Sequence, residues 1–152
     1  MSDTVFFHRD SYCKIELVPE QSAYNVGKDI AALKLPTKEV ESLLAKHALV
    51  FFPVVNTGTS DHTTIKEDTV AYGFEMFGLF VESKQSVVTK LWLGFSVIFP
   101  STNSCNNLLK VLQLIGREYQ LILIDRDNDL SVRLQESNEL EEYLVETFGF
   151  KL

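Results

Sequence analysis

The chain has 152 residues, of which 45% are hydrophobic and 23% are charged, and its formal net charge is −7 at pH 7. These values predict one globular domain over residues 1–152 and exclude a generally disordered chain. No apolar stretch has the length of a membrane span, the N-terminal sequence lacks the pattern of a secretory signal, and Cys13 and Cys105 have neither metal nor redox spacing. We therefore expect a cytoplasmic protein with two free thiols.

The negative charge is concentrated near the C-terminus. Residues 1–116 contain 10 Lys and Arg against 12 Asp and Glu, a net charge of −2, whereas residues 117–152 contain 4 against 9, a net charge of −5. The sequence therefore predicts one acidic region of the surface rather than an evenly acidic protein.

The N-terminal third predicts two short strands and one helix. The strands are expected at Val5–Phe7 and Ile15–Val18, and Pro19 ends the second. Residues 21–34 are compatible with either a loop or a short helix. Thr37 is the expected N-cap of a helix with apolar positions at i, i+3, i+4 and i+7, namely Val40, Leu43, Leu44 and His47.

The middle of the chain predicts an edge strand, a polar loop and a hairpin. Pro53 interrupts the apolar run Leu49–Val55, which favours an edge strand, and Asn56–Thr64 contains no apolar residue and reads as a loop. Two long strands are expected from Val70 and from Val87, and the polar connection Glu82–Ser86 favours an antiparallel hairpin between them. Gly78 and Gly94 are expected to mark β-bulges.

The last third predicts two helices around a second hairpin. Asn103 or Ser104 is expected to cap a helix that Gly116 closes. Strands are predicted at Tyr119–Ile124 and Leu130–Leu134. The final helix is expected to begin at an Asn138 cap with Glu141 at N3, a capping box, and to end at Gly149. The complete pattern predicts an α+β fold, a mostly antiparallel sheet with about three helices packed on it.

Asp125, Asp127 and Asp129, followed by Glu136, match the ligand spacing of an EF-hand loop. Leu130 stands where that loop needs glycine, and the flanking segments read as strands rather than helices. An acidic hairpin tip therefore explains the pattern without a metal ion.

Other chemical motifs give no site. Ser60, Asp61 and His62 are the residue types of a nucleophilic triad, but neighbours in sequence rarely reach triad geometry. The three histidines and two cysteines have no zinc spacing, and no phosphate-binding loop is present. The acidic balance and the absence of a basic cluster disfavour direct nucleic-acid binding. No catalytic residue, metal site or cofactor is predicted.

The sequence favours a non-enzymatic protein that binds a basic protein partner. A concrete form is a cytosolic immunity or inhibitor protein that neutralises a nuclease-type toxin, because such a toxin has a basic cleft for nucleic acid. The candidate partner-binding residues are Asp125, Asp127, Asp129, Glu139, Glu142 and Glu146. Two alternatives stay open: a small-molecule binder or small enzyme with a pocket between the long hairpin and a helix, gated by residues 56–64, and a homo-oligomeric structural subunit.

Overall fold

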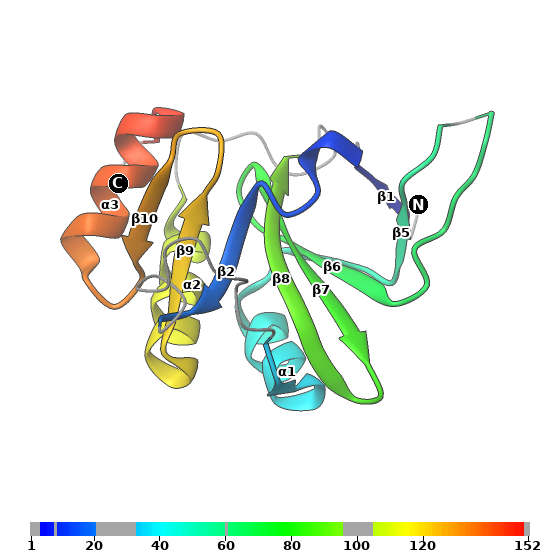
Figure 1. Cartoon of the computed structure of the whole chain (residues 1–152), viewed down its shortest axis with the longest axis horizontal. Coiled ribbons are helices and arrows are strands. Elements are labelled where there is room, and N and C mark those ends of the chain that lie inside the picture. Colours follow the sequence, from blue (N-terminus) through cyan, green and yellow to red (C-terminus); the bar gives the residue numbers. More distant parts are fainter. Residues whose placement is uncertain (1–3, 8, 21–32, 60, 96–104, 151–152) are drawn as a thin grey trace.

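The computed structural model describes residues 4–7, 9–20, 33–59, 61–95 and 105–150. It has the predicted α+β fold, in which helices cover one face of a large antiparallel sheet (Figure 1). The α-helices are α1 (Thr37–His47), α2 (Asn106–Tyr119) and α3 (Ser137–Phe148), and a 3-10 helix, η1, spans Arg9–Ser11. The strands are β1 (Thr4–Phe6), β2 (Ile15–Pro19), β3 (Leu35–Pro36), β4 (Val50–Phe52), β5 (Val54–Asn56), β6 (Thr69–Gly73), β7 (Phe77–Lys84), β8 (Val87–Phe95), β9 (Leu121–Asp125) and β10 (Leu130–Arg133).

The large sheet has the order β10-β9-β2-β8-β7-β6-β4, all neighbours are antiparallel, and β3 adds a short pairing to β8. β4 is the last strand in this order and so is an edge strand, as predicted, and Pro53 ends it before β5 begins. β5 leaves the large sheet and pairs in parallel with β1, forming a small second sheet. No helix in the described part of the chain is long and apolar enough to cross a membrane.

Both faces of the central strands are buried. In β8, Leu91 and Leu93 belong to the core cluster that the sheet shares with α1, α2 and α3, whereas Trp92 belongs to a cluster on the opposite face. This alternation follows the two-residue period of a strand. The second cluster is closed by side chains of the N-terminal segment and of β5, including Val5, Phe7 and Val55. The small sheet therefore forms a third layer over the outer face.

The hairpin between β7 and β8 confirms the expected connection. Gln85 and Ser86 both have positive φ, 54° and 66°, the conformation that a tight two-residue hairpin turn requires. The predicted bulges at Gly78 and Gly94 are wrong: these glycines pair directly, and the register shift lies between Glu82 and Ser83. Gly94 instead leaves room for the Phe80 ring, since a Cβ at position 94 would lie 2.9 Å from Phe80 Cε2.

The single long strand expected from Val70 is also wrong. The chain reverses at Phe74–Met76, between β6 and β7, and Phe74 N donates to Phe77 O at 2.7 Å. Met76 takes a positive φ of 63°, a conformation that its residue type does not signal. The Glu75 carboxylate, now at a turn, accepts hydrogen bonds from Asn107 N at 3.0 Å, Asn107 Nδ2 at 2.8 Å and Leu108 N at 3.1 Å. Glu75 therefore caps the N-terminus of α2 from a distant turn.

Two of the predicted helix starts are displaced. α1 begins at Thr37, so Thr37 is the first helical residue and not the cap. α3 begins at Ser137, with Glu136 in the cap position and no side-chain cap hydrogen bond, so the predicted capping box does not form.

The predicted end of α3 is confirmed at Gly149, which has φ 72°. Gly116 does not close α2: it lies inside the helix, where a Cβ would come within 2.4 Å of Leu134 Cβ, and the helix ends at Gln120 in the left-handed conformation. The predictions for residues 21–32, for Val97–Phe99 and for the Asn103 or Ser104 cap lie outside the described residues.

Candidate functional site

Five of the six acidic candidates are exposed, and they lie on two neighbouring elements at one end of the sheet (Figure 1). Asp127 and Asp129 are in the turn between β9 and β10, and Glu139, Glu142 and Glu146 are on α3. β10 is the last strand of the sheet and packs against α3. We call this surface, made by the β9–β10 turn and the outer side of α3, the acidic face.

Asp125 is different from the other five because it is 1% exposed. Its carboxylate accepts hydrogen bonds from Tyr143 Oη at 2.7 Å, Asn128 Nδ2 at 2.9 Å and Asn128 N at 3.1 Å. Burial alone would raise the pKa of Asp125, but the bonds from Asn128, Tyr143 and the backbone outweigh burial and hold the pKa below its ordinary value. Asp125 therefore organises the turn and fastens it to α3, and its carboxylate does not reach the surface.

The outer side of α3 has no basic residue to balance its acidic ones. Glu139, Glu142 and Glu146 are spaced i, i+3 and i+7, which places them on one exposed stripe of the helix. Like charges at i,i+3 and i,i+4 destabilise a helix by about 0.2–0.5 kcal/mol for each pair. Leu140, Tyr143 and Leu144 hold the opposite side in the core, so burial and not surface charge pairing keeps α3 in place.

Two basic residues near the turn, Arg126 and Lys14, already form ion pairs within the protein. Arg126 pairs with the buried carboxylate of Glu16 at 2.9 Å and donates a further hydrogen bond to Cys13 O. Lys14 lies 3.4 Å from Asp127, an exposed pair that contributes little to stability. The Glu139 carboxylate accepts the Arg133 backbone N–H at 2.8 Å, which covers part of the open edge of β10. Arg126 therefore does little to neutralise the acidic face.

Two large apolar side chains are exposed on the same elements. Leu130, the first residue of β10, is 44% exposed, and Val145, on α3, is 41% exposed. Leu130 pairs with Asp125 across the two strands, and Asp125 accepts a hydrogen bond from Tyr143 on α3. These contacts bring the β9–β10 turn close to the second half of α3. The acidic face thus combines apolar contact points with a charged surround, the arrangement typical of protein–protein interfaces.

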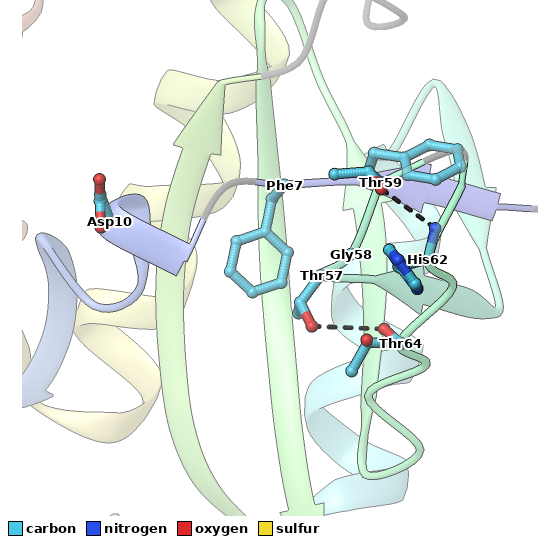
Figure 2. Close-up of a pocket in the computed structure, with 8 residues that line it drawn as sticks. Phe7, Asp10, Thr57, Gly58, Thr59, His62 and Thr64 are labelled. Carbon is cyan, nitrogen blue, oxygen red and sulfur yellow. Dashed lines mark hydrogen bonds between the residues drawn. The ribbon is translucent and has the colours of Figure 1, made fainter.

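A second candidate site is a cavity of about 510 Å³ at the other end of the molecule, beside the small sheet (Figure 2). Its lining residues come from the N-terminal segment and from the polar loop after β5, and they are Phe6, Phe7, Asp10, Thr57, Gly58, Thr59, His62 and Thr64. The polar loop therefore borders a pocket, as the small-molecule alternative expects. The other wall is the N-terminal segment, and not the long hairpin and a helix.

The Ser60-Asp61-His62 motif does not form a catalytic arrangement among its described members. His62 lines the cavity and Asp61 is exposed, while Ser60 is outside the described residues. The His62 backbone N–H donates to Thr59 Oγ1 at 3.1 Å, and this contact holds the loop in shape (Figure 2). Across the part of the chain that the structure describes, no three His, Cys, Asp or Glu side chains form a group that could hold a metal ion.

Both cysteines are buried and neither forms a disulfide. Burial raises the pKa of the Cys13 thiol and of the Cys105 thiol to about 11. Because the thiolate is the nucleophilic form, neither side chain is activated for covalent chemistry near neutral pH.

Sequence reasoning missed a polar cluster that fastens η1 to the β7–β8 hairpin. Tyr12 Oη donates to Glu82 Oε1 at 2.8 Å, and Lys66 Nζ lies 2.6 Å from the same carboxylate oxygen. The Lys66 ammonium is also 5.4 Å from the centroid of the Tyr12 ring. These residues are far apart in the sequence, so no local pattern indicates the cluster.

Comparisons of the chain with protein-family models, with curated proteins and with solved structures give no match.

Proposed function

We propose that this protein is a non-enzymatic binding protein that engages a basic protein partner through the acidic face. The observation that carries the proposal is the combination of a solvent-facing glutamate stripe on α3, an acidic β9–β10 turn and the two exposed side chains of Leu130 and Val145. Clustered carboxylates accelerate the encounter with a basic partner, and desolvated apolar residues supply much of the affinity once it is bound.

The intramolecular contacts support the same proposal. The bonds of Asp125 fix the turn against α3, and Arg126 is paired with Glu16, so Lys14 beside Asp127 is the basic contact that the described structure gives this face and most of its negative charge is left for a partner. A preorganised surface loses less conformational entropy on binding than a mobile one. The specific form we propose is an antagonist of a nuclease-type toxin in the cytoplasm, because the basic cleft of such an enzyme is complementary in charge to this face.

The test compares two variants that each remove three negative charges. The first carries Asp129→Asn, Glu142→Gln and Glu146→Gln on the acidic face, and the second carries Asp61→Asn, Glu67→Gln and Glu118→Gln at exposed positions elsewhere. A partner is first captured with the native protein from cells and identified, and association is then followed by surface plasmon resonance at several salt concentrations.

We expect the first variant to associate roughly tenfold more slowly at low salt and to lose most of its salt dependence. The second variant should bind like the native protein. In cells that produce a toxin partner, only the first variant should fail to protect. Association of the two variants at the same rate would refute the proposal, because the effect would then follow net charge and not the face.

The cavity favours small-molecule binding as a second candidate function. Its volume of about 510 Å³ is within the range of ligand pockets, and its lining mixes aromatic rings with a few polar groups. The cavity and the acidic face lie at opposite ends of the sheet, so one protein can have both functions (Figure 1).

A further inference from the structure

We propose that the cavity binds a neutral, polyhydroxylated ligand with one apolar face, of which a pyranose sugar is the simplest example. This inference rests on the second candidate function, small-molecule binding, and goes beyond it by naming the ligand class. It follows from two properties of the cavity: its polar wall is held in shape before any ligand arrives, and its described lining combines hydroxyl groups and an aromatic ring with a surface charge that disfavours anions.

The polar wall is fastened by a buried amide. Asn56 is 3% exposed, and its Oδ1 accepts hydrogen bonds from Gly58 N at 2.8 Å and Thr64 N at 3.0 Å. One side chain therefore ties together the two arms of the loop, residues 57–59 and 61–64. Direct backbone bonds complete the wall, from Thr57 N to Thr64 O at 2.8 Å and from Thr59 N to His62 O at 2.9 Å.

Glycine at position 58 is a steric requirement of this wall. A Cβ there would lie 1.9 Å from His62 O on the opposite arm. The chain thus uses a glycine and a buried asparagine to close a loop that extends away from the main core (Figure 1). A preformed wall of this kind lowers the entropy cost of binding a small ligand.

The lining chemistry defines the ligand class. Among the lining residues that the structure describes there is no lysine or arginine, and the chain carries a net charge of −7, so anionic ligands are disfavoured. Asp10 also lines the cavity, but it already has an interaction within the molecule, so we expect no preference for a cation. Thr57, Thr59 and Thr64 contribute hydroxyl groups, which match the hydroxyl groups of a polyol. Thr57 Oγ1 donates to Thr64 O at 3.3 Å and keeps its acceptor lone pairs, whereas Thr59 Oγ1 accepts from His62 N at 3.1 Å and keeps its O–H. Phe6, which is 46% exposed, supplies aromatic surface for an apolar ligand face, while Phe7 is 6% exposed and forms part of the apolar base of the cavity.

The experiment is an NMR titration of the 15N-labelled protein with four probes. Methyl β-glucopyranoside is the neutral polyol, glucose 6-phosphate its anionic relative, glucosamine its cationic relative and cyclohexanol its apolar relative. We expect the neutral sugar to shift the amide signals of Phe7, Gly58, His62 and Thr64, with a dissociation constant on the order of millimolar. The three other probes should bind at least about threefold more weakly.

Two matched pairs of variants locate the binding. Thr64→Val removes a lining hydroxyl but keeps the backbone groups that close the loop, and Thr63→Val is its exposed neighbour outside the lining. Phe6 pairs with Asn56 in the small sheet and Ile65 pairs with Asn56 in an isolated β-bridge. They are 46% and 43% exposed, but of the two only Phe6 lines the cavity. We expect Thr64→Val to weaken sugar binding about fivefold and Phe6→Ala to abolish it, whereas Thr63→Val and Ile65→Ala should bind normally.

The outcomes separate the ligand class from the existence of a site. If a charged probe or cyclohexanol binds at these amides more tightly than the sugar, the ligand class is wrong and the small-molecule function stands. If none of the four probes shifts these signals, both the ligand class and the small-molecule function are wrong. Equal losses in the two members of a pair would place sugar binding outside the cavity and overturn the inference.

Discussion

The buried contact between Tyr143 and Asp125 gives a stability prediction that can be calculated from the structure. Tyr143→Phe removes only the phenolic O–H, because the ring can keep its edge contact with Phe148, whose centroid is 5.5 Å away. The lost hydrogen bond, 2.7 Å long, goes to a carboxylate that is 1% exposed. Bonds to charged groups contribute about 1.5–3 kcal/mol, and Asn128 still donates two bonds, so we expect a loss of about 1.5–2 kcal/mol.

Urea unfolding measures this loss, and Tyr12→Phe is the matched control. Tyr12 also donates to a carboxylate, Glu82, over 2.8 Å, but its hydrogen bond is exposed. The control should therefore cost less than about 1 kcal/mol. A double-mutant cycle of Tyr143→Phe with Asp125→Ala should give a coupling energy of at least about 1 kcal/mol, because the two residues share one buried bond.

The same contact predicts how stability changes with pH. Burial would raise the pKa of Asp125, but its hydrogen bonds prevail and hold the pKa below the ordinary value of 3.8. The folded state therefore binds this proton less readily than the unfolded state, so the contribution of Asp125 is complete above pH 3.8 and is lost as the pH falls through the folded-state pKa. The penalty of Tyr143→Phe should shrink in that acidic range. A penalty below about 0.5 kcal/mol at neutral pH, or one that grows on acidification, would refute the reasoning.

Two further substitutions test the contacts that the sequence did not indicate. Glu75→Ala should destabilise the fold by about 2–3 kcal/mol in urea unfolding, because it leaves three hydrogen-bond donors at the start of α2 without their carboxylate. Glu75→Gln should recover part of this loss. An unchanged free energy of unfolding for Glu75→Ala would show that the cap is dispensable. Gly116→Ala should lower the thermal unfolding midpoint, because the clash with Leu134 costs about 1–3 kcal/mol and outweighs the gain of about 1 kcal/mol in helix propensity. A raised midpoint would show that Leu134 can move away from α2 without penalty.

Local patterns in the sequence were sufficient for most of the helices and strands. The β7–β8 and β9–β10 hairpins and the three α-helices follow from residue periodicity and from polar connections, and the structure contains all of them. The reversal between β6 and β7 was not predictable in this way. Phe74, Glu75 and Met76 carry no turn-forming residue type, and the positive φ of Met76 is imposed by the tertiary structure.

The end of α2 was misplaced for a related reason. Glycine after an apolar stripe is the usual signal for a helix end, but Gly116 is needed inside α2 so that Leu134 can approach the helix. That requirement comes from a residue on the far side of the β9–β10 hairpin. A single sequence cannot distinguish a glycine that ends a helix from one that makes room for a neighbour.

The two candidate sites also differ in how far the local sequence predicts them. The acidic face was predictable because its residues are close together in the chain, and counting charges locates them. The cavity was only half predictable, because Phe6 and Phe7 reach the polar loop through the parallel pairing of β1 with β5, and these strands are far apart in the sequence. Long-range pairing of this kind leaves no local pattern.

The burial of Asp125 changes how the acidic region should be understood. Taken as a charge count, the β9–β10 turn has three carboxylates and one guanidinium. In the structure, Asp125 is buried against Tyr143, and Arg126 is exposed but forms an ion pair with the buried carboxylate of Glu16, while Asp127 and Asp129 are exposed. The contacts of Asp125 and Arg126 fix the position of the turn, so substitutions at Asp125 should act through stability and loop position, while substitutions at Asp129 should act through charge. A partner-binding experiment that mutates both together would confuse these two effects, and this is why the proposed face variant leaves Asp125 intact.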